Sequence, residues 1–183
     1  GKTTTTSMLS YILIDADTDP TISVGGILDS IGGNIRVGKS EYFVTEACEY
    51  TNSYHAFKPF ISIILNVDAD HLDFFKDIDE IAESFHVFAT KTPKEGLVIV
   101  NGDMKYYDTV VRDLECRVVT FGKGAQNKYS AHNIRFDDFG HPTYTLVVDG
   151  KEITDITLKV FGEHNVYNSL SAIAASLELG ISI

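Results

Sequence analysis

The stretch GKTTTTSMLSYIL, residues 1–13, decides how the rest of the chain is interpreted. Its first three residues, Gly1, Lys2 and Thr3, match the end of the phosphate-binding pattern G-x-x-x-x-G-K-[ST]. In that pattern the glycine lets the backbone approach phosphate, the lysine neutralises the β- and γ-phosphates, and the hydroxyl coordinates Mg²⁺. Apolar residues at positions 8, 9, 12 and 13 have helical spacing, so a helix is predicted to follow at once. Three residues match by chance in many proteins, but a helix N-terminus attracts anions and favours a phosphate-binding loop here.

Four segments further along are predicted to be buried β-strands: residues 42–47, 60–67, 97–101 and 117–121. Three of them are apolar almost without alternation, which is typical of strands covered on both faces. Two segments between them carry apolar residues at helical spacing, residues 77–90 and 105–114. Strands and helices in alternation predict an α/β fold for residues 1–122, with a P-loop-type, mainly parallel sheet flanked by helices.

Residues 129–160 show a different pattern, with near period-two alternation in three short segments: 133–136, 143–148 and 153–160. The pair Asp149-Gly150 between the last two favours a tight hairpin. We therefore predict a small three-stranded antiparallel sheet after the parallel one. A last helix is predicted over residues 165–179, and Gly180 ends it.

The composition narrows the possible partners. Acidic residues outnumber basic ones by 26 to 15, giving a formal net charge of −11 over 183 residues. This charge argues against a nucleic-acid partner, which needs a basic face, and against docking on an anionic membrane. No apolar run reaches the roughly 18 residues that span a membrane, and no signal peptide is visible. Cys48 and Cys116 have no C-x-x-C spacing and are interpreted as reduced thiols of a cytoplasmic protein.

Polar side chains follow two of the predicted parallel strands. Glu46 ends the first, and a run with several oxygen ligands follows the second: Asn66, Asp70, His71 and Asp73. Ligands of open α/β sheets bind at the carboxyl ends of strands, and Mg²⁺ prefers oxygen ligands. If the two strands are neighbours, their axes lie about 5 Å apart, and Glu46 and His71 could share a metal site with Thr3. The alternatives are a solvated strand end for Glu46 and a structural role for His71.

The segment GEHNVYN, residues 162–168, opens the predicted last helix. Asn165 and Asn168 are three residues apart and therefore share a helix face. Their amides can donate and accept hydrogen bonds at once, as adenine recognition requires. Ordinary helix capping by asparagine is the alternative interpretation.

Four motifs in this order resemble those of the Mur ligase family, the ATP-dependent amide-bond ligases of peptidoglycan assembly. They are GKTTTT at residues 1–6, Glu46 after its strand, Asn66-x-x-x-Asp70-His71, and Gly162-x-His164-Asn165-x-x-Asn168. The resemblance covers nearly the whole chain. The predicted antiparallel segments also match the small antiparallel sheet of the family's central domain.

Within the family the chain is most similar to the alanine-adding branch. Residues 24–28, 42–49 and 70–73 carry this similarity. Several other branches have a carbamylated lysine in the helix after the Asp-His pair, whereas residues 77–90 contain no lysine here. The chain departs from an acidic run common in the family at positions 48, 50 and 51, where local substrate contacts are expected.

The resemblance implies ATP and Mg²⁺ as cofactors and UDP-N-acetylmuramate and L-alanine as substrates. It implies that ATP is bound by Gly1, Lys2, Thr3, Thr4, His164, Asn165 and Asn168. Thr3, Glu46 and His71 would hold Mg²⁺, and Lys2, Glu46 and His71 would be the catalytic residues. The lactoyl carboxylate would attack the γ-phosphate of ATP, and the amine of L-alanine would then attack the acyl phosphate.

By the same resemblance, residues 1–183 would form a central ATP-binding domain that begins inside its phosphate-binding loop. A UDP-binding domain would precede it in the same polypeptide and an amino-acid-binding domain would follow. A related ligase, such as the one that recycles murein tripeptide or a folylpolyglutamate synthase, is an alternative with similar motifs. A nucleotide-binding module without ligase activity is an alternative of another class.

Overall fold

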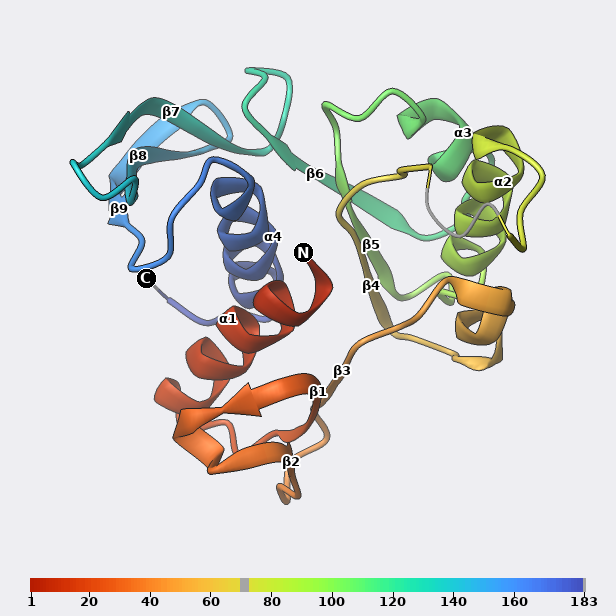
Figure 1. Ribbon diagram of the computed structural model, residues 1–183, viewed down its shortest axis with the longest axis horizontal. Helices are drawn as coiled ribbons and strands as arrows, with labels where there is room; N and C mark the ends of the chain where they lie inside the picture. Colours follow the sequence, from red (N-terminus) through yellow and green to blue (C-terminus); the bar gives the residue numbers. More distant parts are fainter. Residues whose placement is uncertain (70–72, 183) are drawn as a thin grey trace.

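The computed structural model describes residues 1–69 and 73–182, which form two β-sheets with helices packed around them (Figure 1). The larger sheet has the strand order β4-β5-β6-β7-β8-β9, and the smaller has the order β2-β1-β3. The helices are α1 (Lys2–Asp15), α2 (Ile78–Ala89), α3 (Tyr107–Val111) and α4 (His164–Glu178), with short 3-10 helices η1 (Asp29–Ile31) and η2 (Tyr50–Ala56). The strands are β1 (Thr21–Leu28), β2 (Gly33–Arg36), β3 (Phe43–Thr45), β4 (Ile61–Ile64), β5 (Leu97–Asn101), β6 (Arg117–Gly122), β7 (Tyr129–Phe136), β8 (Pro142–Val148) and β9 (Lys151–Thr157).

Strands β4 to β7 of the larger sheet are parallel, and β7, β8 and β9 pair antiparallel. This confirms the predicted fold class, a mainly parallel sheet joined to an antiparallel unit. The antiparallel strands do not form a sheet of their own, however. Phe121 of β6 lies opposite Tyr129 of β7, so the antiparallel unit continues the parallel sheet. The strand predicted at 133–136 accordingly begins four residues earlier, at Tyr129.

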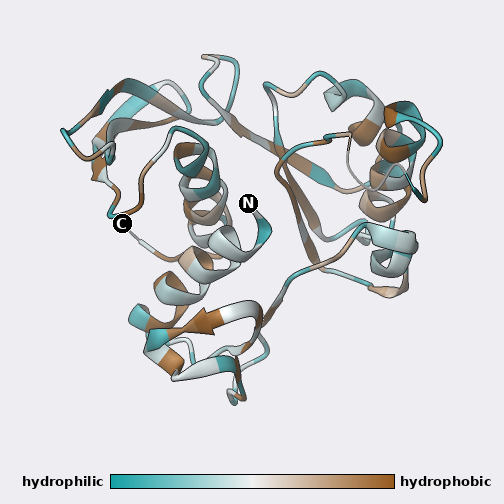
Figure 2. Ribbon diagram, viewed as in Figure 1, coloured by the Kyte–Doolittle hydropathy of each residue, from teal (hydrophilic) through white to brown (hydrophobic). Residues whose placement is uncertain are grey.

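The core has two sides because successive residues of a strand point to opposite faces of a sheet. In the fully buried strand β5, Leu97 and Ile99 pack into the cluster formed with α1 and α4. Val98 and Val100 pack into a second cluster formed with α2 and α3. Figure 2 shows the apolar colour along the central strands between these helices. The uninterrupted apolar sequence of β5 therefore reflects burial on both faces, as predicted.

The smaller sheet was not anticipated from the sequence. Strand β1 packs Ile22 and Val24 into a third core cluster with Ile14 of α1. Strand β3 pairs in parallel with β1, with Thr21 opposite Phe43. Residues 42–47 and 60–67 are therefore not neighbours in one sheet, and the prediction of a single parallel sheet over residues 1–122 was wrong in this respect. The two adjacent glycines at positions 25 and 26 interrupt the apolar alternation of β1, which is why its pattern did not predict a strand.

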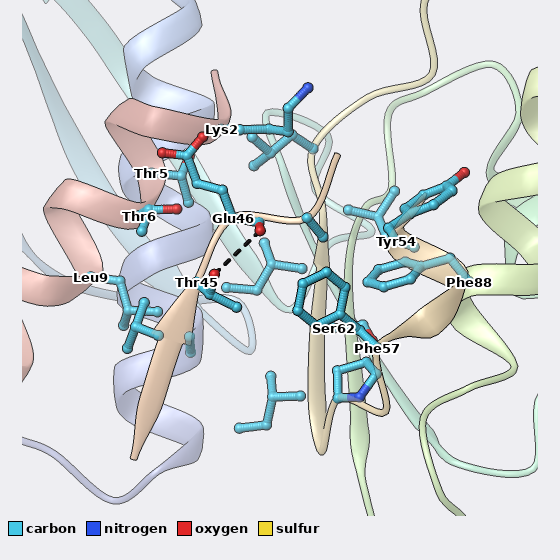
Figure 3. A pocket seen from close by; sticks show the side chains of 18 of the residues that line it. Lys2, Thr5, Thr6, Leu9, Thr45, Glu46, Tyr54, Phe57, Ser62 and Phe88 are labelled. Atoms are coloured by element: carbon cyan, nitrogen blue, oxygen red, sulfur yellow. Dashed lines mark hydrogen bonds between the residues drawn. The ribbon is translucent and has the colours of Figure 1, made fainter. Parts of the chain in front are cut away.

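A cavity of about 880 Å³ lies between β3 and β4 (Figure 3). Leu9 and Leu13 of α1 line it on one side, and Tyr54 and Phe88 line it on the other. Each of the two strands is the outer strand of its own sheet on the side that faces this cavity. The cavity ends at Gly1 and Lys2, where the candidate functional site begins.

Candidate functional site

The N-terminus of α1 forms the centre of the candidate site. Gly1 caps the helix, and the first intrahelical hydrogen bond runs from the Thr5 N–H to the Gly1 carbonyl, at 3.0 Å. The cap contributes no side-chain hydrogen bond, and the first turn contains no acidic residue. The backbone N–H groups of this first turn have no partner within the helix, which makes the helix end attractive to an anion. Lys2 and Thr3 are exposed here, while Thr4 is half-buried.

Glu46 and Thr3 meet, although they are 43 residues apart in the sequence. The Thr3 hydroxyl donates to Oε2 of Glu46 at 3.1 Å. Glu46 directly follows β3, whose parallel pairing with β1 brings this strand end to the start of α1. Figure 3 shows Lys2 and Glu46 near each other at one end of the cavity. Thr3 and Glu46 therefore lie together through the pairing of β3 with β1 in the smaller sheet.

Lys2 is bound by a carboxylate to which the sequence alone assigned no role. Its Nζ donates to Oε1 and Oε2 of Glu49 at 3.0 and 2.8 Å. The Glu49 side chain is only 12% exposed, whereas that of Lys2 is 47% exposed. Glu49 is the second acidic residue of the run Glu46-Ala47-Cys48-Glu49, and its spacing from Glu46 was the signal that could have identified it.

The loop that carries Glu49 is held by a buried polar network. The Tyr54 hydroxyl and the Ser84 hydroxyl lie 2.7 Å apart, and Ser84 also bonds to Asn52. Asn52 and its neighbour Thr51 both have positive φ angles, so the loop adopts a conformation that costs energy locally. Burial raises the pKa of Tyr54, which keeps its phenol neutral and able to donate. Satisfied buried networks of this kind rigidify the loops that they hold.

The second predicted strand end is described only in part. Asp70 and His71 lie outside the described residues. Asn66 donates to Asp68 at 2.9 Å, and the Tyr50 hydroxyl donates to Asp73 at 3.1 Å. This hydrogen bond to Asp73 raises the pKa of the Tyr50 phenol.

The predicted residues of the last helix lie at the start of α4. His164 is exposed, whereas Asn165 and Asn168 are buried. Asn168 donates to Oδ1 of Asn165 at 2.9 Å, and Asn165 donates to the carbonyl of Phe161, also at 2.9 Å. Neither amide caps the helix, since the cap residue Glu163 has no side-chain cap bond. A methyl group placed on Gly1 would lie 3.9 Å from Oδ1 of Asn168, so this part of α4 adjoins the start of α1.

The donors present fit a magnesium-bound phosphate group. The Thr3 hydroxyl and the Glu46 carboxylate offer two oxygen donors beside the ammonium of Lys2. Mg²⁺ uses few protein ligands and takes the rest from water and substrate phosphates. Within residues 1–69 and 73–182, no group of three or more His, Cys, Asp or Glu side chains could hold a metal by itself. An ion held jointly with a phosphate therefore suits these residues better than a metal held by protein alone.

No helix in the described part of the chain has both the length and the apolar character needed to cross a bilayer.

This arrangement defines a P-loop-type α/β domain, because the helix after Gly1 brings a lysine and a hydroxyl to the acidic end of a neighbouring strand. The Mur ligase middle domain matches residues 1–176. The chain belongs to the Mur ligase family.

Individual relatives agree with this assignment. The UDP-N-acetylmuramate–L-alanine ligase of Lachnospira eligens is 56% identical over 184 aligned residues, which cover 100% of this chain and 40% of that protein. The UDP-N-acetylmuramate-alanine ligase structure from Thermotoga maritima matches with a TM-score of 0.83 and 29% identity, covering 100% of this chain and 40% of the other. The UDP-N-acetylmuramate:L-alanyl-γ-D-glutamyl-meso-diaminopimelate ligase from Neisseria meningitides has a TM-score of 0.86 and 28% identity, covering 99% and 59%. The chain thus spans about two fifths of the length of the curated relative.

Proposed function

We propose that this chain is the nucleotide-binding part of an ATP-dependent ligase that joins L-alanine to UDP-N-acetylmuramate. The main observation in support is the contact between Thr3 and Glu46. It joins the start of α1 to the end of β3 in an arrangement suited to a metal-bound nucleotide. The identity of 56% to a UDP-N-acetylmuramate–L-alanine ligase supports this substrate pair.

The reaction activates a carboxylate. The carboxylate of the sugar nucleotide attacks the γ-phosphate, which gives an acyl phosphate and ADP, and the amine of L-alanine then displaces phosphate to form the amide. Catalysis of phosphoryl transfer is mostly positioning and charge stabilisation. Lys2 and the α1 N-terminus supply positive charge to the phosphates, while Thr3 and Glu46 hold Mg²⁺, which would neutralise phosphate charge when bound.

The remaining predicted residues complete this proposal. His71 would hold a second Mg²⁺, which would neutralise charge between the carboxylate and the γ-phosphate. His164, Asn165 and Asn168 would lie near the nucleotide, and the hydrogen bond between the two asparagines holds their amides beside the start of α1. Because Asn165 and Asn168 are buried in this structure, His164 is the member of this group that can reach a ligand directly.

The chain acts as a central domain of a longer polypeptide that also contains a UDP-binding and an amino-acid-binding domain. The coverage of only 40% of the curated relative supports this division.

The test is an assay of the full-length protein with ATP, Mg²⁺ and UDP-N-acetylmuramate. We expect phosphate release to require L-alanine, and the tripeptide L-alanyl-γ-D-glutamyl-meso-diaminopimelate not to replace it. Efficient use of the tripeptide would instead indicate a recycling ligase, and ATP binding without any ligation would indicate a nucleotide-binding module.

Lys2→Ala should lower kcat in the same assay by about 10²- to 10³-fold, as the loss of one preorganised charge donor does elsewhere.

A further inference from the structure

Both carboxylate oxygens of Glu46 are held, and each is held by a different element. Oε2 accepts from the Thr3 hydroxyl of α1 at 3.1 Å. Oε1 accepts from the backbone N–H of Gly25 in β1 at 2.6 Å. The carboxylate is therefore fixed in one orientation between the start of a helix and the middle of a strand.

The glycines of β1 lie directly against the two oxygen donors. A Cβ at position 25 would lie 3.1 and 3.2 Å from the two carboxylate oxygens of Glu46. A Cβ at position 26 would lie 3.3 Å from Cγ2 of Thr3. Neither glycine is among the residues with positive φ, so their backbones would accept alanine. Close approach to Glu46 and Thr3, and not backbone conformation, is what favours glycine here.

We propose that Gly25 and Gly26 are positioning residues for the oxygen donors at the start of α1. The Gly25 N–H holds one oxygen of Glu46, so that the other remains beside the Thr3 hydroxyl, and Gly26 leaves space for the Thr3 side chain. This inference rests on the proposed role of Thr3 and Glu46 in holding Mg²⁺. Groups that orient a metal ligand typically change metal affinity by about 10- to 100-fold when they are lost.

The experiment measures Mn²⁺ binding to the full-length protein in the presence of ADP, by electron paramagnetic resonance. Gly25→Ala keeps the backbone N–H but places a Cβ 3.1 and 3.2 Å from the two oxygens of Glu46, so we expect it to displace this carboxylate and weaken Mn²⁺ binding by about 10- to 100-fold. Gly26→Ala should weaken Mn²⁺ binding less, because its contact is with a methyl group. Gly33→Ala is the matched control, since a Cβ at Gly33 of the adjacent strand β2 would meet nothing within 4 Å. Melting temperatures measured without metal show whether each variant is folded. If Gly25→Ala does not fold, Mn²⁺ binding by Gly26→Ala tests the proposal.

Glu46→Gln separates this inference from the proposed function. If Glu46→Gln weakens Mn²⁺ binding while folded Gly25→Ala and Gly26→Ala bind it like the wild type, the positioning role is wrong and the metal role of Glu46 stands. If Glu46→Gln also binds Mn²⁺ like the wild type, both are wrong. Equal weakening in Gly33→Ala would show that the effect comes from the sheet in general and would overturn the positioning role.

Discussion

The ammonium of Lys2 lies between both carboxylate oxygens of Glu49, at 3.0 and 2.8 Å. In the proposed reaction this ammonium must serve the phosphates of ATP, so nucleotide binding has to weaken or replace the contact with Glu49. Solvent around the exposed Lys2 ammonium screens this ion pair and limits what it contributes. Glu49 therefore holds the Lys2 ammonium near the position in which it would contact the phosphates, and breaking this ion pair costs nucleotide binding only a modest amount of free energy.

Glu49→Gln should tighten ATP binding by a few-fold, because the ammonium no longer has to leave a full negative charge. Calorimetric titration of the full-length variant with ATP would measure this change. Glu115→Gln removes the same charge from an exposed position between α3 and β6 and should leave ATP affinity unchanged. Weaker binding by Glu49→Gln would contradict the prediction and would show that Glu49 supports the bound nucleotide.

At the scale of single elements, the end of α4 is fastened to the larger sheet through Glu178. Its carboxylate accepts from Lys128 at 2.7 Å and from the Tyr129 hydroxyl at 2.8 Å, and it also pairs with Arg117. The side chain is 6% exposed. Burial acts to raise the pKa of Glu178, but the hydrogen bonds from Lys128 and Tyr129 outweigh it, so this pKa lies below its usual value.

A lowered pKa in the folded state means that Glu178 contributes stability above its unfolded pKa and loses that contribution as the pH falls through its folded pKa. Glu178→Gln should therefore lower the free energy of unfolding at pH 7 by about 1–3 kcal/mol. The difference from the wild type should shrink as the pH falls below about 4. Denaturant unfolding of the chain across this range would measure it.

Glu83→Gln is the control for this prediction. Glu83 pairs with Arg112 on the surface, where both side chains are about half exposed, 52% and 48%. Its loss should change the free energy of unfolding much less than the loss of Glu178, because solvent screens an exposed pair. A Glu178→Gln effect that is equally small, or that grows toward low pH, would refute the fastening role of Glu178.

At the scale of the whole molecule, the candidate site lies in the middle of the fold, at the cavity between β3 and β4 (Figure 1). The chain covers 40% of the length of the Lachnospira eligens ligase. Lys2 and Glu46 both line the cavity that separates the two sheets. In the proposed three-domain arrangement, the sugar nucleotide and L-alanine would also contact residues outside this chain.

The 183-residue chain alone should accordingly show no L-alanine-dependent phosphate release, whereas the full-length protein should. Circular dichroism and cooperative unfolding would confirm that the shorter chain is folded in the same assay buffer. Alanine-dependent release by the folded 183-residue chain would show that this domain is sufficient for the reaction.

Much of the fold follows from local sequence patterns. The apolar run of residues 97–101 predicted β5 with its exact bounds, and helical spacing predicted α2 and α4 to within a residue at each end. Gly1, Lys2, Thr3 and Glu46 could be proposed as site residues from their types and places, whereas Glu49 was not. These patterns can be recognised from the sequence because helix periodicity, strand burial and loop motifs each depend on residues that are close in the sequence.

The tertiary structure alone decided which distant residues meet. It paired β3 with β1 instead of β4, brought Glu49 to Lys2 across 47 residues, and brought the Gly25 N–H to Glu46 across 21. A strand's own residues show that it is buried but not which neighbouring edge it pairs with, because that choice depends on how all the elements pack together. A glycine in a strand likewise shows a need for space, and only the folded chain shows that a carboxylate fills it.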